Sequence, residues 1–127
     1  MSDPTLLFVY GMLMSGEVGF RSLGLETRVR VLGPERISGR LHHLGDYPGL
    51  IIGKHGIVHG ELFAFSDPRV LEDIDVYELY DPENAAGSEY RRIEVDLLGS
   101  GKRASAYEYN RPITNRPIIA TGNWRAR

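Results

Sequence analysis

The chain has 127 residues, of which 42% are hydrophobic and 25% are charged, and its formal net charge is −2. This length suits one domain with its own hydrophobic core. The sequence has no cysteine, which excludes disulfides, thiolate metal sites and a cysteine nucleophile. Its low net charge gives no indication of binding to nucleic acid or to an anionic membrane. No basic leader and no apolar run of roughly 20 residues is present, so we expect a cytoplasmic protein.

The first predicted element is a strand over residues 6–10, an apolar and aromatic run that ends at Gly11. A continuous apolar run of this kind is typical of a strand buried on both faces. Because glycine has no Cβ, Gly11 permits a sharp turn and lets a ligand approach the main chain. The amides of Gly11, Met12 and Leu13 then face a cleft as an anion or oxyanion cradle. The alternative is an ordinary turn after a buried strand.

Several short elements are predicted next. A helix is expected at 18–25, and a strand at 27–32 is expected to break at residues 33–34 before a second strand at 37–44. A strand at 50–52 is then expected to lead through a hairpin turn at 53–56 into a strand at 57–65. Fifteen glycines and seven prolines agree with many turns in a β-rich fold.

A helix is predicted over residues 68–79, because Asp67 suits the N-cap and Pro68 the first helical position. Leu71 and Ile74 lie on one face of this helix at 3.6 residues per turn. The remaining acids of the helix are expected in solvent: Glu72, Asp73 and Asp75.

Glu78 follows Ile74 by four residues and therefore shares the inward face, near the C-terminal end of the helix. The helix dipole disfavours a negative charge there, and desolvation raises the pKa of a carboxyl group. A carboxyl with a raised pKa suits general acid or base catalysis. The alternative is a structural glutamate paired with Arg91 or Arg92.

The remaining predicted elements are a loop at 80–88 and strands at 90–98 and 103–109. Tyr90, Tyr107 and Tyr109 are candidates for the wall of a pocket, or else for ordinary packing. The tail at 110–127 either packs over the barrel through Ile118, Ile119 and Trp124 or pairs with a second subunit.

The four histidines do not predict a metal site. His55 and His59 are four residues apart in a turn and a strand, and four strand residues span about 13 Å, too far for one ion. His42 and His43 point to opposite faces of a strand.

Together, these motifs resemble the γ-glutamylcyclotransferase-like (AIG2-like) family. Residues 10–13, Tyr-Gly-Met-Leu, are similar to its Y-G-[ST]-L motif, and residues 74–78, Ile-Asp-Val-Tyr-Glu, to its L-D-x-x-E helix. Residues 60–63 and 90–92 resemble the strands on either side of that helix. The motifs follow the family's order from residue 6 to about residue 109.

The resemblance implies an α+β fold, a small mixed β-barrel with short flanking helices. Residues 1–127 would form one such domain, with 110–127 as its C-terminal tail. It also implies cyclisation of a γ-glutamyl amine or γ-glutamyl amino acid to 5-oxoproline and a free amine, without a metal or other cofactor. Glu78 would be the general acid/base. The glutamyl end would be bound by Tyr10, Gly11, Met12, Leu13 and Tyr90.

Two positions depart from the family pattern. Met12 stands in place of the usual serine or threonine, and Leu79 in place of the glycine that commonly follows the glutamate. These departures support a second hypothesis, a non-catalytic module of the same fold that binds a small acidic ligand or a protein. A nucleic-acid-binding barrel is a third possibility, which the low net charge disfavours.

Overall fold

Strand β1 (Thr5–Val9) lies at the centre of the sheet, as its apolar sequence predicts. Its last three residues, Leu7, Phe8 and Val9, are buried. The strand pairs antiparallel with β3 (Pro48–Phe65) and parallel with β5 (Arg103–Tyr109). The structure, a computed structural model, describes residues 3–127 apart from the side chain of His55.

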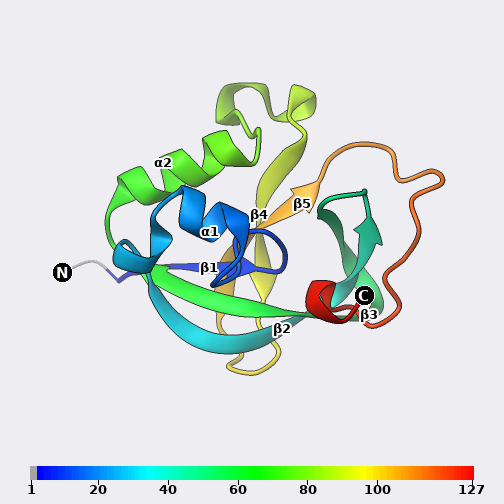
Figure 1. Cartoon of the computed structure of the whole chain (residues 1–127), viewed down its shortest axis with the longest axis horizontal. Helices are drawn as coiled ribbons and strands as arrows, with labels where there is room; N and C mark the ends of the chain where they lie inside the picture. The colour runs from blue at the N-terminus through cyan, green and yellow to red at the C-terminus, as the bar shows by residue number, and fades with distance from the viewer. Residues whose placement is uncertain (1–2) are drawn as a thin grey trace.

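The five strands form one mixed sheet in the order β2-β3-β1-β5-β4, with β2 (Arg30–His43) and β4 (Tyr90–Asp96) at its edges. Figure 1 shows this sheet curling into a half-barrel with a few short helices around it. The amide of Leu98, just beyond β4, donates to the carbonyl of Arg36 on β2 at 2.9 Å. This bond joins the two edges of the sheet, and the predicted fold class is confirmed.

Strand β2 is longer than predicted, and the expected break at residues 33–34 is wrong. The register with β3 shifts between Val31 and Gly33, and Gly33 has a φ of 118°. Such a bulge absorbs the glycine without ending the strand. Pro34 follows without disruption, because an edge strand tolerates the missing N–H of proline.

The predicted hairpin turn at 53–56 is also wrong, because β3 continues through it in one direction. Ser38 pairs with Ile57 and Gly39 pairs with Ile52, so residues 53–56 lie outside the ladder with β2. The glycines at both ends of this stretch accommodate an irregularity within one long strand instead of reversing the chain.

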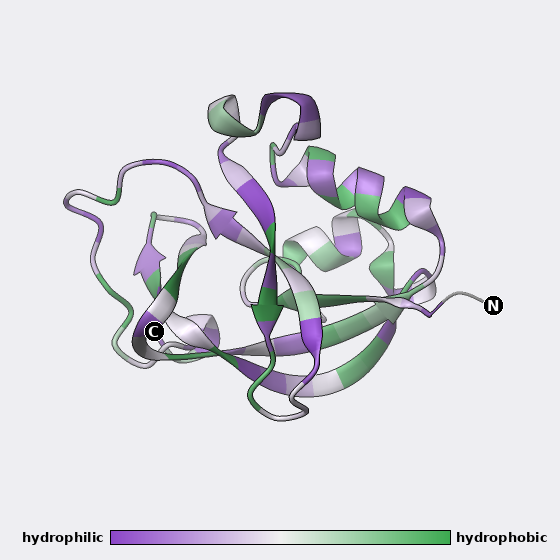
Figure 2. Ribbon diagram, turned by 180° about the vertical axis from the view of Figure 1, so that it is seen from behind, coloured by the Kyte–Doolittle hydropathy of each residue, from purple (hydrophilic) through white to green (hydrophobic). Residues whose placement is uncertain are grey.

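The helices are short and begin where the sequence predicts. Helix α1 (Val18–Ser22) ends earlier than expected and leads into the 3₁₀ turn η1 (Leu25–Thr27). Helix α2 (Pro68–Tyr77) begins at its predicted cap, where the carboxylate of Asp67 accepts the amide of Arg69 at 2.9 Å. Hydrophobic and hydrophilic residues alternate along α2 (Figure 2), and its hydrophobic side faces the sheet through the buried Val70 and Ile74.

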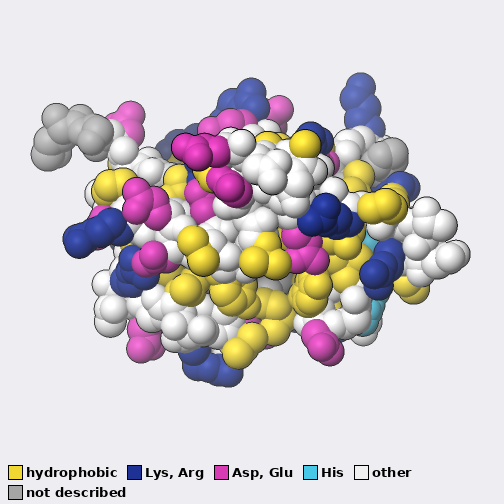
Figure 3. Space-filling model, turned by 90° about the horizontal axis from the view of Figure 1, so that it is seen from above, with side chains coloured by type: hydrophobic (Ala, Val, Ile, Leu, Met, Phe, Trp, Pro, Cys, Tyr) yellow, Lys and Arg dark blue, Asp and Glu magenta, His cyan; other side chains and the backbone are white. Residues whose placement is uncertain are grey.

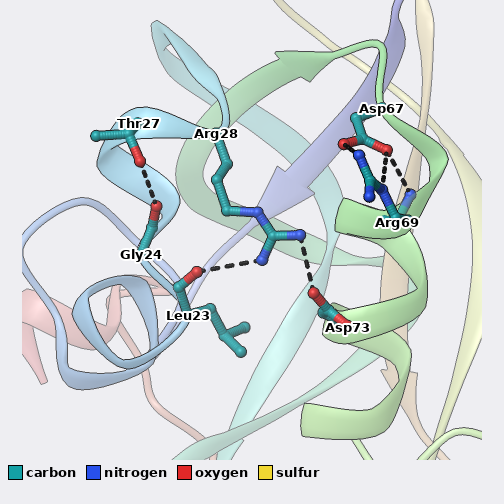
Figure 4. A network of polar contacts seen from close by, with 7 residues as sticks. All are labelled: Leu23, Gly24, Thr27, Arg28, Asp67, Arg69 and Asp73. Carbon is teal, nitrogen blue, oxygen red and sulfur yellow. Dashed lines mark hydrogen bonds and ion pairs between the residues drawn. The ribbon is translucent and has the colours of Figure 1, made fainter.

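Arg28 connects η1 to α2 (Figure 4). Its Nη2 lies 2.8 Å from Oδ2 of Asp73, and its Nη1 donates to the carbonyl of Leu23 at 3.3 Å. Because the Asp73 side chain is half exposed, the pair contributes little stability. It does connect the segment that follows α1 to the middle of α2.

The C-terminal tail packs on β2 of its own chain. The amide of His43 donates to the carbonyl of Pro117 at 2.7 Å, and the amide of Ile119 donates to the carbonyl of Leu41 at 2.8 Å. Ile119 and Trp124 are buried, the latter at the start of the 3₁₀ turn η3 (Trp124–Ala126). The remaining 3₁₀ element, η2 (Pro82–Gly87), follows α2. Within residues 3–127, no helix has the length and apolar character needed to cross a membrane.

The neighbouring isoleucines of the tail provide a matched test of this packing. We predict that Ile119→Ala lowers the free energy of unfolding by about 2–5 kcal/mol, because it opens a cavity under the tail. Ile118 is 55% exposed, so Ile118→Ala changes the free energy by no more than about 0.5 kcal/mol. Urea denaturation of both variants measures the difference, and equal effects would show that the tail is not packed as described.

Candidate active site

A cavity of about 260 Å³ lies where β1, α2 and β4 meet. Viewed from the α2 side, hydrophobic side chains run across the middle of the surface and meet acidic groups there (Figure 3). All six predicted site residues line the cavity: Tyr10, Gly11, Met12, Leu13, Glu78 and Tyr90. Most of the remaining wall comes from residues that the sequence did not single out for the site: Tyr47, Pro48, Tyr77, Leu79 and Glu89.

The loop after β1 contributes three consecutive residues to the wall of this cavity. Within the described part of the chain, the N–H groups of Gly11, Met12 and Leu13 have no hydrogen-bond acceptor. A residue of β3 holds the loop in place. The carboxylate of Glu61 accepts hydrogen bonds from the amide of Ser15 at 2.6 Å and from the Ser15 hydroxyl at 2.7 Å. These bonds fix the backbone and leave the three amides available to an anionic ligand.

The predicted turn does begin at Gly11, where the amide of Met14 donates to its carbonyl at 3.1 Å, but a close contact is what requires a glycine there. Its φ is not positive, and a Cβ on it would lie 2.7 Å from Cγ of Pro48. The glycine therefore makes room for a proline that also lines the cavity. The carbonyl of Pro48 in turn accepts the hydroxyl of Tyr90 at 2.8 Å.

Glu78 is the C-cap of α2, one residue beyond the end of the helix, whereas the prediction continued the helix to Leu79. The residue is half-buried and lines the cavity. Burial raises the pKa of Glu78 from 4.5 to about 8, and the neighbouring charge of Glu89 adds to the rise. The alternative of a structural ion pair is wrong, since Arg91 pairs with Glu108 and Arg92 with Asp75.

Asp75 was expected in solvent, but the structure buries it. The guanidinium of Arg92 donates to both of its oxygens at 2.6 and 2.5 Å, and the hydroxyl of Tyr107 donates to Oδ1 at 2.5 Å. The guanidinium also lies over the ring of Tyr80, 5.4 Å from its centroid. These contacts fasten α2 to β4 and β5 three residues before Glu78.

Leu79 takes a left-handed conformation, with φ of 55°. The amide of Tyr80 donates to the carbonyl of Asp75 at 2.9 Å, and the amide of Leu79 donates to that of Val76 at 3.1 Å. This pair of bonds is the Schellman motif, whose left-handed position favours glycine. The departure at Leu79 thus keeps the helix end but adds backbone strain, and it places an exposed apolar side chain at the cavity.

Two buried tyrosines hold the inner wall. The hydroxyl of Tyr10 donates to the carbonyl of Tyr107 at 2.6 Å, and Tyr90 is bound to Pro48 as described. Burial raises the pKa of both Tyr10 and Tyr90 above the usual value, so they remain neutral hydroxyl donors. Of the three predicted wall tyrosines, Tyr90 and Tyr107 line the cavity, whereas Tyr109 packs edge-on against Tyr90 with ring centroids 5.3 Å apart.

Glu89 is the main residue that the sequence analysis missed. Its amide donates to the carbonyl of Leu79 at 3.1 Å, which joins the end of α2 to the start of β4. Its Oε1 accepts the hydroxyl of Tyr47 at 3.3 Å. In the sequence, only the position of Glu89 directly before Tyr90 could have indicated that it lies at the site.

Two of the histidines that the structure describes, His42 and His43, make contacts other than those of a metal site. No group of three histidine, aspartate or glutamate side chains suited to a metal ion occurs among the described residues, and the side chain of His55 lies outside them. His42 is buried, with Nδ1 2.8 Å from the carbonyl of Arg116, and the ring of His43 lies 5.3 Å from that of Trp124.

Comparisons with known proteins identify the family. The family described as gamma-glutamyl cyclotransferase, AIG2-like, matches residues 7–126. The chain is 32% identical over 120 residues to the gamma-glutamylcyclotransferase family protein ytfP of Citrobacter rodentium, which covers 93% of both chains. The YtfP protein of Escherichia coli has the same identity and covers 93% of this chain and 94% of its own.

Solved structures agree with this assignment. The solution structure of ytfP from Escherichia coli has a TM-score of 0.68 at 30% identity and covers 94% of this chain and 96% of its own. An AIG2-like protein from Mus musculus has a TM-score of 0.67 at 21% identity, covering 87% and 81%, a similarity of fold alone. The chain therefore belongs to the AIG2-like gamma-glutamyl cyclotransferase family.

The raised pKa of Glu78 makes stability depend on pH in a testable direction. Between pH 4.5 and about 8, the unfolded chain has an ionised Glu78 while the folded chain keeps it protonated, so stability falls as pH rises. We predict that Glu78→Gln removes this loss. Urea denaturation gives the free energy of unfolding of both proteins. We expect the variant to gain stability relative to the wild type as the pH rises from 4.5 to 8.5. A difference that is the same at both pH values would contradict the assigned burial.

The strain at Leu79 gives a second prediction. Leu79→Gly relieves the left-handed penalty and loses some backbone entropy, so the free energy of unfolding rises by about 0.5–1 kcal/mol. Leu79→Ala is the matched control, because it shortens the side chain but keeps the Cβ that causes the strain. Thermal or urea denaturation should show stabilisation by glycine and none by alanine; the reverse order would contradict the conformation of Leu79.

Proposed function

We propose that the protein is a γ-glutamylcyclotransferase that converts a γ-glutamyl amine or γ-glutamyl amino acid to 5-oxoproline and a free amine. Family membership supports a cyclotransferase-like activity in general. The observation that supports the specific reaction is the shared cavity, which is lined both by Glu78 and by the loop residues 11–13, whose amides have no acceptor among the described residues.

The reaction joins two groups of the same substrate. The α-amine attacks the γ-carbonyl carbon, a new C–N bond closes the five-membered ring, and the bond to the leaving amine breaks. The α-ammonium loses two protons and the leaving amine gains two, so no net proton is released. Because nucleophile and carbonyl belong to one molecule, holding the chain in a folded conformation supplies much of the rate.

Glu78 serves the proton transfers in this proposal. It accepts a proton from the α-ammonium and delivers a proton to the leaving amine. A pKa of about 8 suits both duties near neutral pH, because the protonated and ionised forms are both accessible.

The loop amides bind the glutamyl end. The N–H groups of Gly11, Met12 and Leu13 are donors for the α-carboxylate or for the oxyanion that develops on the γ-carbonyl. Backbone amides do this work whatever the side chain, so Met12 in place of serine or threonine is compatible with activity. Tyr10 and Tyr90 form the wall beside the bound group.

The alternative is a non-catalytic module that binds a small acidic ligand. The strained Leu79 and the absent hydroxyl at Met12 favour it. A panel of γ-glutamyl amines and γ-glutamyl amino acids assayed for 5-oxoproline separates the two functions, because the module binds members of the panel without turnover.

Substitution of Glu78 tests the proposed role directly. We predict that Glu78→Gln lowers the rate of 5-oxoproline release by about 10²–10⁴-fold, the contribution typical of general acid–base catalysis. Glu72→Gln, an exposed glutamate on the same helix, is the control and retains the wild-type rate. Circular dichroism shows whether both variants remain folded. A folded Glu78→Gln variant with undiminished turnover would rule out the role of Glu78.

A further inference from the structure

Every polar group of Ser15, two residues beyond the three loop amides, is bonded to a distant segment of the chain. Its amide and hydroxyl donate to the carboxylate of Glu61 on β3 at 2.6 and 2.7 Å. Its carbonyl accepts a hydrogen bond from Nη2 of Arg125, which lies 110 residues further along the chain. The end of the loop is therefore held from two directions, once by β3 and once by the tail.

The guanidinium of Arg125 binds two parts of the loop region at once. While Nη2 donates to the carbonyl of Ser15, Nε donates to Oε2 of Glu17 at 2.9 Å. Glu17 is the N-cap residue of α1. Because the N–H groups of a guanidinium diverge in a fixed plane, both acceptors must keep one relative position. Arg125 thus fixes the end of the loop against the start of α1.

This contact is better suited to positioning the loop than to stabilising the whole protein. The side chains of Arg125 and Glu17 are 42% and 28% exposed, and an ion pair with such exposure adds little to the free energy of unfolding. Loops, however, open at a much lower free energy than the folded core. A contact that is weak on the scale of the fold therefore has a large effect on the order of the loop.

The segment that carries Arg125 is itself firmly docked. The amide of Arg125 donates to Oδ1 of Asn123 at 3.0 Å, which begins the turn η3. The side chain of Trp124 is only 2% exposed. One residue earlier than Asn123, the carbonyl of Gly122 accepts the amide of His59 on β3 at 2.9 Å. The guanidinium therefore extends from a backbone that is fixed to the sheet.

Hydrogen bonds within the loop connect Ser15 to the amides at 11–13. The amide of Met14 donates to the carbonyl of Gly11 at 3.1 Å, and the amide of Glu17 donates to the carbonyl of Met14 at 3.0 Å. Residues 11–17 thus form two successive hydrogen-bonded turns. A displacement at Ser15 changes the direction of the N–H groups at 11–13, and hydrogen bonds weaken steeply when they are misaligned.

We propose that residues 122–125, which we call the strap, position the loop amides for the α-carboxylate of a γ-glutamyl substrate, with Arg125 as the positioning residue. This inference rests on the proposed function. Arg125 does not line the cavity, so it acts only through the loop that it holds. The α-carboxylate keeps its charge from bound substrate to transition state, so a correctly placed loop stabilises both alike. Loosening the strap therefore raises KM and leaves kcat unchanged.

Hydrogen exchange in the ligand-free protein tests whether the strap holds the loop. We expect Arg125→Ala to speed amide exchange at Ser15 and Glu17 about tenfold, because the loop region loses two charge-assisted hydrogen bonds. Exchange in β1 and β5 stays at the wild-type rate, which shows that the fold is intact. Arg127→Ala is the matched control and leaves loop exchange unchanged, because Arg127 contacts the ring and the carbonyl of Trp124.

Kinetics on the fastest compound of the γ-glutamyl panel test the consequence for binding. We expect KM to rise about tenfold in Arg125→Ala, while kcat stays within about twofold of the wild-type value. Arg127→Ala keeps both constants at their wild-type values. A general loss of structure would instead lower the apparent kcat, because less of the enzyme would be active.

Three results would overturn the strap. The first is loop exchange that Arg125→Ala leaves unchanged, the second is an equal effect of the two arginine variants, and the third is a fall in kcat at constant KM.

The two measurements separate this proposal from the proposed function, because hydrogen exchange requires no reaction. A loop that Arg125→Ala loosens in a protein that releases no 5-oxoproline from any panel compound would overturn the proposed function, and the strap would stand as the device that orders the loop. Release of 5-oxoproline with the same KM in Arg125→Ala and wild type would overturn the strap and leave the function standing.

Discussion

The buried contact of Asp75 with Arg92 and Tyr107 determines where the end of α2 lies, and the site depends on it. Both partners belong to the sheet, one on β4 and one on β5. A buried carboxylate without such partners would strongly destabilise the folded protein. The helix therefore has one well-defined position on the sheet. Because Glu78 follows Asp75 by three residues, this contact also fixes the position of Glu78 at the cavity.

The cavity combines opposite electrostatic features within a small space. On one side, three backbone amides have no acceptor among the described residues and favour negative charge. On the other, the carboxyls of Glu78 and Glu89 lie close enough for the second to raise the pKa of the first. A zwitterionic amino-acid group with its carboxylate toward the loop and its ammonium toward Glu78 fits this arrangement.

Much of this could be predicted from local sequence, and the rest depended on contacts between distant segments. Helical periodicity was enough to turn Glu78 inward, and an apolar run was enough to bury β1. The same periodicity wrongly predicted Asp75 to lie in solvent, because the residues that bind it, Arg92 and Tyr107, are on strands that a helical pattern does not describe. Glu89 was missed for a similar reason, since only the meeting of a helix end with a strand start brings it to the cavity.

A crystal structure of the protein with 5-oxoproline tests the central claim most directly, because it locates the product relative to both halves of the cavity. We expect the product carboxylate or carbonyl to lie within hydrogen-bond distance of the amides of Gly11, Met12 or Leu13, with the ring nitrogen facing Glu78. Product bound elsewhere, or a Glu78 side chain turned away from an occupied cavity, would contradict it.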